Sequence, residues 1–125
     1  MLRSFKEIKE PIKNVLSSKD DDGFITNIKL VYSNFQLELV PEADCCSISW
    51  FIEKTDLKVL IGKEIDFIDE DTKSEINLPD SNIQEVDKHY LYKFYFKNSL
   101  DEFDIYLTNS SNGYYDGWLS VKLVK

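Results

Sequence analysis

One strand-and-corner pattern occurs twice in the sequence. The segment 35–51 aligns without a gap on the segment 103–119. The residues that coincide are similar or identical in type: Phe35 and Phe103, Leu37 and Ile105, Leu39 and Leu107, Asp44 and Asn112, and Trp50 and Trp118. A repeat of this kind constrains the chain to a fold in which two like halves pack together. We therefore predict a duplicated architecture.

The repeat continues towards the start of each half. Two further pairs of segments match in residue type: 8–15 with 61–68, and 28–34 with 92–98. A length of 125 residues is usual for a single domain. We therefore predict one domain over residues 1–125, with its halves at approximately 5–60 and 61–125.

Alternation of apolar and polar residues predicts most of the secondary structure. Strands are expected at 12–17, 28–32, 35–40, 92–98, 103–107 and from 118 onward. Asp22-Gly23 predicts a hairpin, because glycine supplies the positive φ of a tight reversal. Ser4 with Glu7 and Ser49 with Glu53 predict short helical turns, and the acidic segment 69–87 predicts an exposed loop. The expected fold class is α+β: mainly antiparallel β-sheet from two duplicated β-rich halves, with one or two short helices.

Charge and hydropathy exclude several classes of function. The formal net charge is −8, and the lysines are scattered, so the chain has no basic run to attract a phosphate backbone. We expect no nucleic-acid partner. The N-terminus has no apolar signal region, and apolar residues nowhere run long enough to span a bilayer. We expect a cytoplasmic protein with no membrane partner, in which both cysteines are reduced thiols.

Cys45 and Cys46, next to Asp44, look like half of a metal site. Structural zinc takes four ligands, however, and adjacent side chains on an extended segment point to opposite faces. His89 is the one imidazole, and it lies half a chain away, so it is poorly placed to activate a thiol. We predict no metal, no cofactor and no catalytic residue, and at least one cysteine that acts as a small hydrophobic residue.

The second corner contains two tight-turn dipeptides, Asn112-Gly113 and Asp116-Gly117, on either side of Tyr114 and Tyr115. Either these aromatic rings fold back over the core, or they form an exposed recognition knuckle, because tyrosine gives rigid contact area at low entropic cost. The sequence does not decide whether the two corners lie together. The candidate partner- or ligand-binding residues are Asp44, Cys45, Cys46, Trp50, Asn112, Gly113, Tyr114, Tyr115 and Trp118.

Three motifs stand in an order that is known from other proteins. They are Asp44-Cys45-Cys46-Ser47 with Trp50, Leu60-Ile61-Gly62-Lys63 with Ile65, and Asn109-Ser110-Ser111-Asn112-Gly113-Tyr114-Tyr115-Asp116-Gly117. On these residues the chain resembles a family of small uncharacterised domains found largely in phages and other viruses. The resemblance implies a viral accessory protein, and it carries no agreed activity, so it assigns no catalytic residue.

The favoured hypothesis is a non-enzymatic small binding protein, a viral or phage modulator of a host protein that acts through the two corners. The alternative is a protein that sequesters a small molecule, such as a metabolite or signal, near Trp50 and Trp118. A metal- or thiol-dependent enzyme is the least favoured hypothesis. The identity of the partner and the oligomeric state are left open.

Overall fold

The regular secondary structure of the described residues is almost entirely β-strand. The computed structural model describes residues 2–73 and 75–125. Its elements, in order, are β1 (Leu2–Ser4), β2 (Asn14–Lys19), β3 (Ile25–Val31), β4 (Gln36–Ala43), β5 (Ile48–Glu53), the 3₁₀ helix η1 (Leu57–Leu60), β6 (Ile65–Asp71), β7 (Val86–Phe96), β8 (Glu102–Ser111) and β9 (Gly117–Val124). All paired strands are antiparallel.

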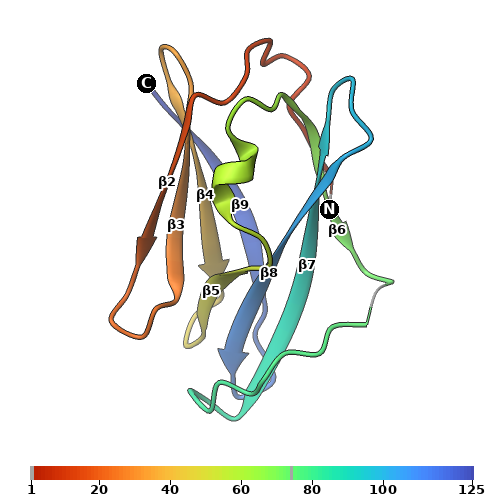
Figure 1. The fold of residues 1–125 in the computed structure, drawn as a ribbon. Helices are drawn as coiled ribbons and strands as arrows, with labels where there is room; N and C mark the ends of the chain where they lie inside the picture. The colour runs from red at the N-terminus through yellow and green to blue at the C-terminus, as the bar shows by residue number, and fades with distance from the viewer. Residues whose placement is uncertain (1, 74) are drawn as a thin grey trace.

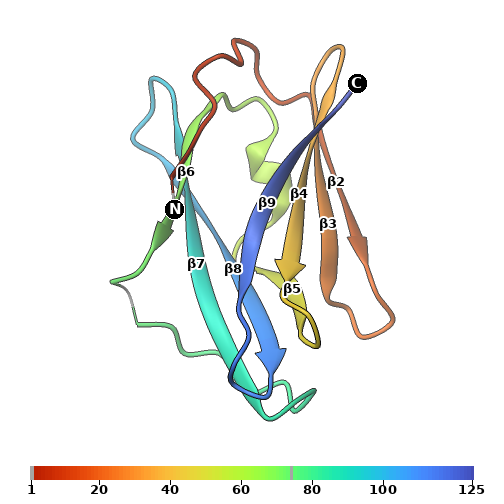
Figure 2. The same ribbon diagram turned by 180° about the vertical axis from the view of Figure 1, so that it is seen from behind.

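The strands form one curled sheet that resembles a half-barrel (Figure 1). The strand order is β1-β6-β7-β8-β5-β3-β4-β9, and β2 pairs with β3 beside this path. A single residue pair, Ile25 with Phe51, joins β3 to β5. The sheet bends at this joint, with β7 and β8 on one side and β2, β3, β4 and β9 on the other (Figure 2).

The fourth strand of each sequence half pairs with the other half. β5 follows β4 in the chain but pairs with β8, and β9 follows β8 but pairs with β4. Both connections therefore cross between the two sides of the sheet, and they do so at the same end. This exchange is the pattern expected of two halves related by a twofold rotation, and the duplicated architecture stays a prediction.

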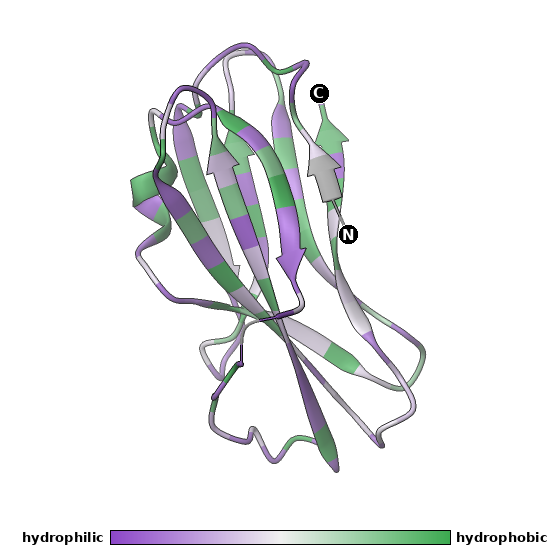
Figure 3. Ribbon diagram, turned by 90° about the vertical axis from the view of Figure 1, so that its right-hand side faces the viewer, coloured by the Kyte–Doolittle hydropathy of each residue, from purple (hydrophilic) through white to green (hydrophobic). Residues whose placement is uncertain are grey.

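The core lies inside the curl of the sheet. Apolar and polar residues alternate along several strands (Figure 3). In β3, β4 and β8 the apolar side chains of one face are buried in the core. The buried apolar cluster consists of Phe5, Ile12, Val15, Ile25, Ile28, Leu30, Tyr32, Leu37, Leu39, Phe51, Leu57, Leu60, Ile65, Ile68, Tyr92, Phe94, Phe96, Phe103, Ile105, Leu107 and Leu119. Residues from both sequence halves contribute to this one cluster.

The prediction of an α+β fold is wrong, because no α-helix occurs in residues 2–73 and 75–125. The helix expected at Ser49–Glu53 is strand β5. Phe51 enters the core on one face of this strand and Trp50 is buried on the other, and a two-sided apolar strand loses the alternation that marks strands in sequence. Strand β1 ends at Ser4, and the expected turn follows it as a single turn, in which the Ile8 amide donates to the Phe5 carbonyl at 3.0 Å. Among the described residues the one helical element is η1, whose cap Asp56 accepts a hydrogen bond from the Lys58 amide at 2.9 Å.

The acidic segment expected as a loop over 69–87 is shorter than predicted. Strand β6 extends to Asp71, and β7 begins at Val86. The predicted hairpin at Asp22-Gly23 is confirmed, since Gly23 has φ +83° and joins the antiparallel pair β2 and β3. The hairpin was therefore predictable from sequence, whereas strand β6 was not predicted, and its last residues lie in the segment expected as a loop.

Candidate functional site

The two corners meet at one end of the molecule. β4 and β9 pair along their whole length, which places Ala43 opposite Gly117, so the residues that follow β4 and precede β9 are neighbours. The Asp44 amide donates to the Asp116 carbonyl at 3.0 Å, and the Asp116 amide donates to Asp44 Oδ2 at 3.2 Å. We call residues 44–48 and 112–116 together the paired corners.

A buried polar cluster holds the paired corners from beneath. Asn109 Nδ2 donates to Ser47 Oγ and to Ser49 Oγ, each at 3.1 Å. A Cβ added to Gly117 would clash with Ser49 Oγ and lie 3.0 Å from both Asn109 Cβ and the Glu42 carbonyl. Glycine is therefore required at residue 117 by close packing. Sequence reasoning missed Asn109, although a polar Thr-Asn-Ser-Ser run at the end of an apolar strand was a visible signal.

The irregular segment before β7 is tied to the same end. Gln84 Nε2 donates to the Cys46 carbonyl at 3.2 Å, and the Gln84 amide donates to Ser110 Oγ at 2.9 Å. Ser81 donates to Asp87 through its amide at 2.7 Å and its hydroxyl at 2.9 Å. Burial alone would raise the pKa of Asp87, but the bonds from Ser81 and Ser110 lower it. Part of the acidic segment is thus docked, and no sequence motif marks Gln84.

Charge ties the second corner to strand β7. Asp116 Oδ1 accepts from Lys88 Nζ at 2.9 Å and from the Tyr90 hydroxyl at 3.1 Å. These two bonds lower the pKa of Asp116, that from Lys88 most. Burial, together with the nearby Asp116 and Glu70 carboxylates, raises the pKa of Tyr90 to about 12. Tyr90 therefore stays protonated and serves as a hydrogen-bond donor.

The paired corners expose apolar side chains. Tyr114 is 86% exposed and Ile48 is 50% exposed, whereas Tyr115 is half-buried. Val86, 40% exposed, lies beside Gly113, because a Cβ on that glycine would be 3.4 Å from Val86 Cγ2. The sequence left open whether the tyrosines of the second corner fold back over the core or are exposed. In the structure, Tyr114 lies outside the core.

The thiols of Cys45 and Cys46 lie together on this surface. Both residues are exposed, and their sulfur atoms are 3.2 Å apart. Cys46 has φ +69°, so the segment is a turn rather than an extended strand, and the side chains do not point to opposite faces. The thiol–thiol contact, then the charges of Cys46 and Asp44, raise the pKa of Cys45. Neither thiol is the buried hydrophobic residue that the sequence suggested.

The two candidate tryptophans differ in their surroundings. Trp50 is 2% exposed and stacks on Phe24, with ring centroids 4.3 Å apart. Its Nε1 is buried, and it has no hydrogen-bond partner among the described residues. A hollow of about 240 Å³ adjoins the ring and is lined by Phe24, Trp50, Ile52, Pro79, Asp80, Ser81 and Thr108. Trp118 lies outside this hollow and is half-buried on β9. The structure therefore does not bring the two indole rings into one pocket.

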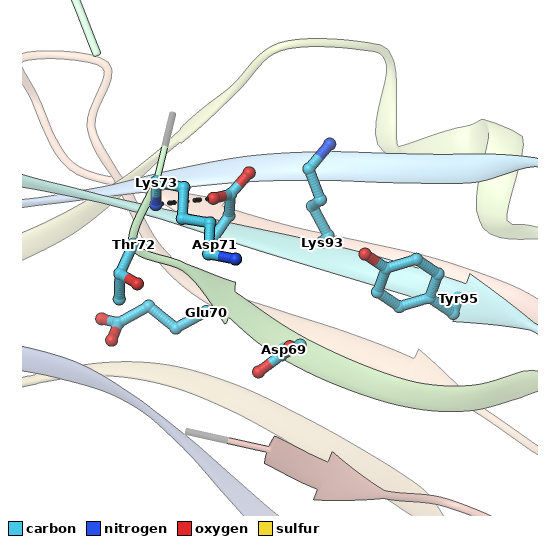
Figure 4. A pocket seen from close by; sticks show the side chains of 7 residues that line it. All are labelled: Asp69, Glu70, Asp71, Thr72, Lys73, Lys93 and Tyr95. Atoms are coloured by element: carbon cyan, nitrogen blue, oxygen red, sulfur yellow. Dashed lines mark hydrogen bonds between the residues drawn. The ribbon is translucent and has the colours of Figure 1, made fainter. Parts of the chain in front are cut away.

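A second hollow, of about 360 Å³, lies on the acidic face of β6 and β7 (Figure 4). It is lined by Asp69, Glu70, Asp71, Thr72, Lys73, Lys93 and Tyr95. Burial alone would lower the pKa of Lys93, but the carboxylates of Asp104 and Glu102, 3.4 Å away, raise it. Lys93 therefore stays protonated and belongs to a network of surface ion pairs, as charged surface residues usually do.

The described residues offer few other groups that could form a catalytic or metal site. His89 Nδ1 lies 2.9 Å from Thr108 Oγ1 on the outer face of the sheet. Within residues 2–73 and 75–125, no three His, Cys, Asp or Glu side chains converge in a way that would hold a metal ion. None of the helical elements in these residues has the length and hydropathy that a membrane-spanning helix requires.

Comparison with known proteins gives the chain a family. No solved structure matches it. The uncharacterised protein L278 of Acanthamoeba polyphaga mimivirus is 48% identical over 82 residues, which cover 64% of this chain and 63% of that protein. The chain thus spans less than two thirds of the length of this relative. Residues 5–121 match the family described as Domain of unknown function (DUF7448). The chain therefore belongs to this uncharacterised viral family.

Proposed function

We propose that the chain is a non-enzymatic protein that binds a partner protein through the paired corners. The observation that carries this proposal is the meeting of two turns, one from each sequence half, through the Asp44–Asp116 contacts. In keeping with its viral family, we propose that the partner is a host protein whose activity the chain modulates. No catalytic residue, metal or cofactor is part of the proposal.

The surface chemistry suits a protein interface. Tyr114, Ile48 and Val86 offer exposed apolar area. Asn109 hydrogen-bonds to Ser47 and Ser49, the residues on either side of Ile48. Exposed aromatic rings on rigid turns are typical anchors of interfaces, because little conformational entropy is lost when they bind. The net charge of −8 favours a partner with a basic rim around an apolar centre.

Site-specific photo-crosslinking tests the proposal. A photoreactive phenylalanine analogue is placed at Tyr114, at Val86 or, as the matched control, at Leu100. Leu100 is 101% exposed and lies on the β7–β8 hairpin, at the other end of the sheet from the paired corners (Figure 1). The chain is then irradiated in cells that naturally express it.

The expected result is one crosslinked partner that is the same from Tyr114 and Val86 and absent from Leu100. Unlabelled wild-type chain should compete it away, and the Tyr114→Ala variant should compete less well. Equal crosslinking from all three positions, or different partners from Tyr114 and Val86, would contradict the proposal.

A second candidate function is the binding of a small molecule in the hollow beside Trp50. The buried Nε1 without a partner favours it, because an unpaired buried donor is costly and an acceptor on a ligand would satisfy it. The volume of about 240 Å³ is below the roughly 300–1,000 Å³ of pockets for drug-sized ligands, so the ligand would be small and mainly apolar.

Native mass spectrometry of freshly purified protein separates the two candidates. Extra mass that persists in the wild type and is lost in Trp50→Phe, which keeps an apolar ring but removes the donor, supports the small molecule. If the protein purified from an expressing cell carries no extra mass, the small-molecule candidate is excluded and the partner proposal is retained. The same spectrum reports the number of subunits.

A further inference from the structure

We propose that Cys45 and Cys46 are a redox-modifiable pair that oxidises reversibly to a disulfide between adjacent residues. The inference concerns covalent chemistry at the β4–β5 turn and does not depend on partner binding. It starts from the separation of the two sulfur atoms, 3.2 Å.

That separation is short for two thiols that are not bonded. A disulfide bond is about 2.05 Å long, so closure requires the sulfurs to approach by roughly 1.2 Å. Rotation of exposed side chains supplies movements of this size. Both cysteines are exposed, so an oxidant reaches them without unfolding of the core.

The fold holds this turn in place on three sides. The Cys46 carbonyl accepts from Gln84, the Asp44 amide donates to Asp116, and the Ser47 amide and hydroxyl both donate to the Asp44 carbonyl, at 3.1 and 2.7 Å. The positive φ of Cys46, +69°, is a conformation that few non-glycine residues adopt. The thiols therefore converge because the folded chain imposes the turn.

The reaction balances with a disulfide oxidant such as oxidised glutathione. One thiol loses its proton and attacks a sulfur of the oxidant, which releases one reduced thiol and leaves a mixed disulfide. The second thiol loses its proton and attacks the protein sulfur of that mixed disulfide, which releases the other reduced thiol. Two electrons and two protons pass from the cysteine pair to the oxidant, and one sulfur–sulfur bond forms in the protein.

The product should be easily reduced. Adjacent residues have Cα atoms about 3.8 Å apart, whereas most disulfides join Cα atoms about 4.4–6.8 Å apart. The strained bond has a higher reduction potential than a structural disulfide, as is usual for labile and regulatory disulfides. The raised pKa of Cys45 also slows the reaction, because only the thiolate attacks. The pair therefore stays reduced under ordinary cytosolic conditions and responds to oxidising ones.

The test is a titration of the full chain with mixtures of reduced and oxidised glutathione, quenched with an alkylating reagent and followed by intact mass. The expected product is a monomer that has lost two hydrogens, carries no glutathione and has no thiol left to alkylate. Excess reduced glutathione should restore both thiols. Accumulation of glutathione adducts or of linked dimers, or two thiols that remain at the most oxidising ratio, would overturn the inference.

Two controls isolate the role of the fold. Cys45→Ser and Cys46→Ser each leave one thiol, so each should instead take up one glutathione, which shows that the oxidant reaches both positions. The circular dichroism spectra of these variants should match that of the wild type. In the wild-type chain unfolded by denaturant, internal disulfide should require more oxidising mixtures. If the folded and unfolded chains form the disulfide at the same ratio of reduced to oxidised glutathione, the folded turn does not favour disulfide formation. That result would also overturn the inference.

Discussion

The two corners occupy matching places in the repeated sequence, yet they are built differently. The first, residues 44–48, is held by hydrogen bonds from the Asn109 and Gln84 side chains and carries two thiols, and the tryptophan that follows it is 2% exposed. The second, residues 112–116, is held by the Asp116 carboxylate and carries an exposed tyrosine, and its tryptophan is half-buried. The same position in a strand pattern therefore does not fix which side chain becomes core and which becomes surface.

The difference follows from what covers each strand. The segment between β6 and β7 contributes Pro79, Asp80 and Ser81 to the surroundings of Trp50, and Phe24 stacks on its ring. Trp118 lies opposite Glu42 on the outer side of β9 and keeps part of its surface in water. Burial at equivalent positions is decided by segments that the repeat does not include.

Replacing the two tryptophans in turn should give the largest contrast. Trp50→Ala removes a buried, stacked ring and should lower the free energy of unfolding by about 3–5 kcal/mol. Trp118→Ala should cost clearly less, because part of that ring is already hydrated. Urea unfolding of both variants measures the difference. Equal losses would mean that the two corners are buried alike.

Gly117→Ala should give the next largest effect. The alignment places Ser49 on Gly117, and in the structure these two residues face each other, so there is room for one side chain. The added methyl group should lower the free energy of unfolding by about 1–3 kcal/mol. Combining it with Ser49→Gly should recover part of the loss, because the closest atom is then absent. Additive losses in the double variant would contradict this contact.

Asp44→Ala should have a smaller effect. It removes the acceptor of the Asp116 amide and leaves the reverse backbone bond in place. One hydrogen bond contributes about 0.5–1.5 kcal/mol to the free energy of unfolding, and the exposure of this one favours the lower end. Thermal unfolding measures the loss. A variant as stable as the wild type, with unchanged protection of the Asp44 amide from hydrogen exchange, would show that the side chain does not join the corners.

Acid should weaken the second corner through Asp116. Bonds from Lys88 and Tyr90 place its folded-state pKa below the unfolded value of 3.8, so the ionised form stabilises the folded protein. This contribution is present above that value and is lost as the pH falls through the folded-state pKa. Asp116→Asn should therefore show a shallower loss of stability below about pH 4 than the wild type.

Asp101→Asn is the matched control for this acid effect. The pKa of Asp101 is also lowered, by the hydrogen bond and charge of Lys63, but this residue precedes β8 at the opposite end of the strand from the corners. Both variants should flatten the acid limb, while hydrogen exchange near Asp44 should respond to Asp116→Asn alone. A response to both variants would mean that the acid effect is global.

Tyr114→Ala should have the smallest effect on stability. Its ring is 86% exposed, and surface substitutions of this kind usually change the free energy of unfolding by less than about 0.5 kcal/mol. The same variant should lose the crosslinked partner. If the variant loses stability but still binds the partner, the Tyr114 ring packs against the folded protein. This was the first of the two interpretations that the sequence left open.

Much of the strand pattern was predictable because alternation is a local signal. The hairpin at Gly23 and the strands around Ile28, Leu37 and Ile105 follow from it. The erroneous helix at Ser49–Glu53 arose because Trp50 and Phe51 are buried on opposite faces, which hides the period. Trp50 is buried by residues from distant segments, and the sequence of β5 alone does not show that they cover it.

The turn residues of the two corners could be identified from the sequence, but the contact between the corners could not. The turn dipeptides were visible, but the sequence left open whether Tyr114 is exposed. The meeting of Asp44 with Asp116 depends on the pairing of β4 with β9, which are far apart in sequence. The convergence of the Cys45 and Cys46 thiols depends on the positive φ angle of Cys46, which cannot be predicted from the residue type. Long-range register and single dihedral angles are what the sequence pattern leaves undetermined.

The central claim is that the two corners form a single surface, and nuclear magnetic resonance tests it most directly. In a labelled sample of the full chain, the Asp44 amide proton should show close contacts to the backbone protons of Asp116 and Gly117, and slow exchange with solvent. A fast-exchanging Asp44 amide without contacts to either residue would show that the corners stand apart.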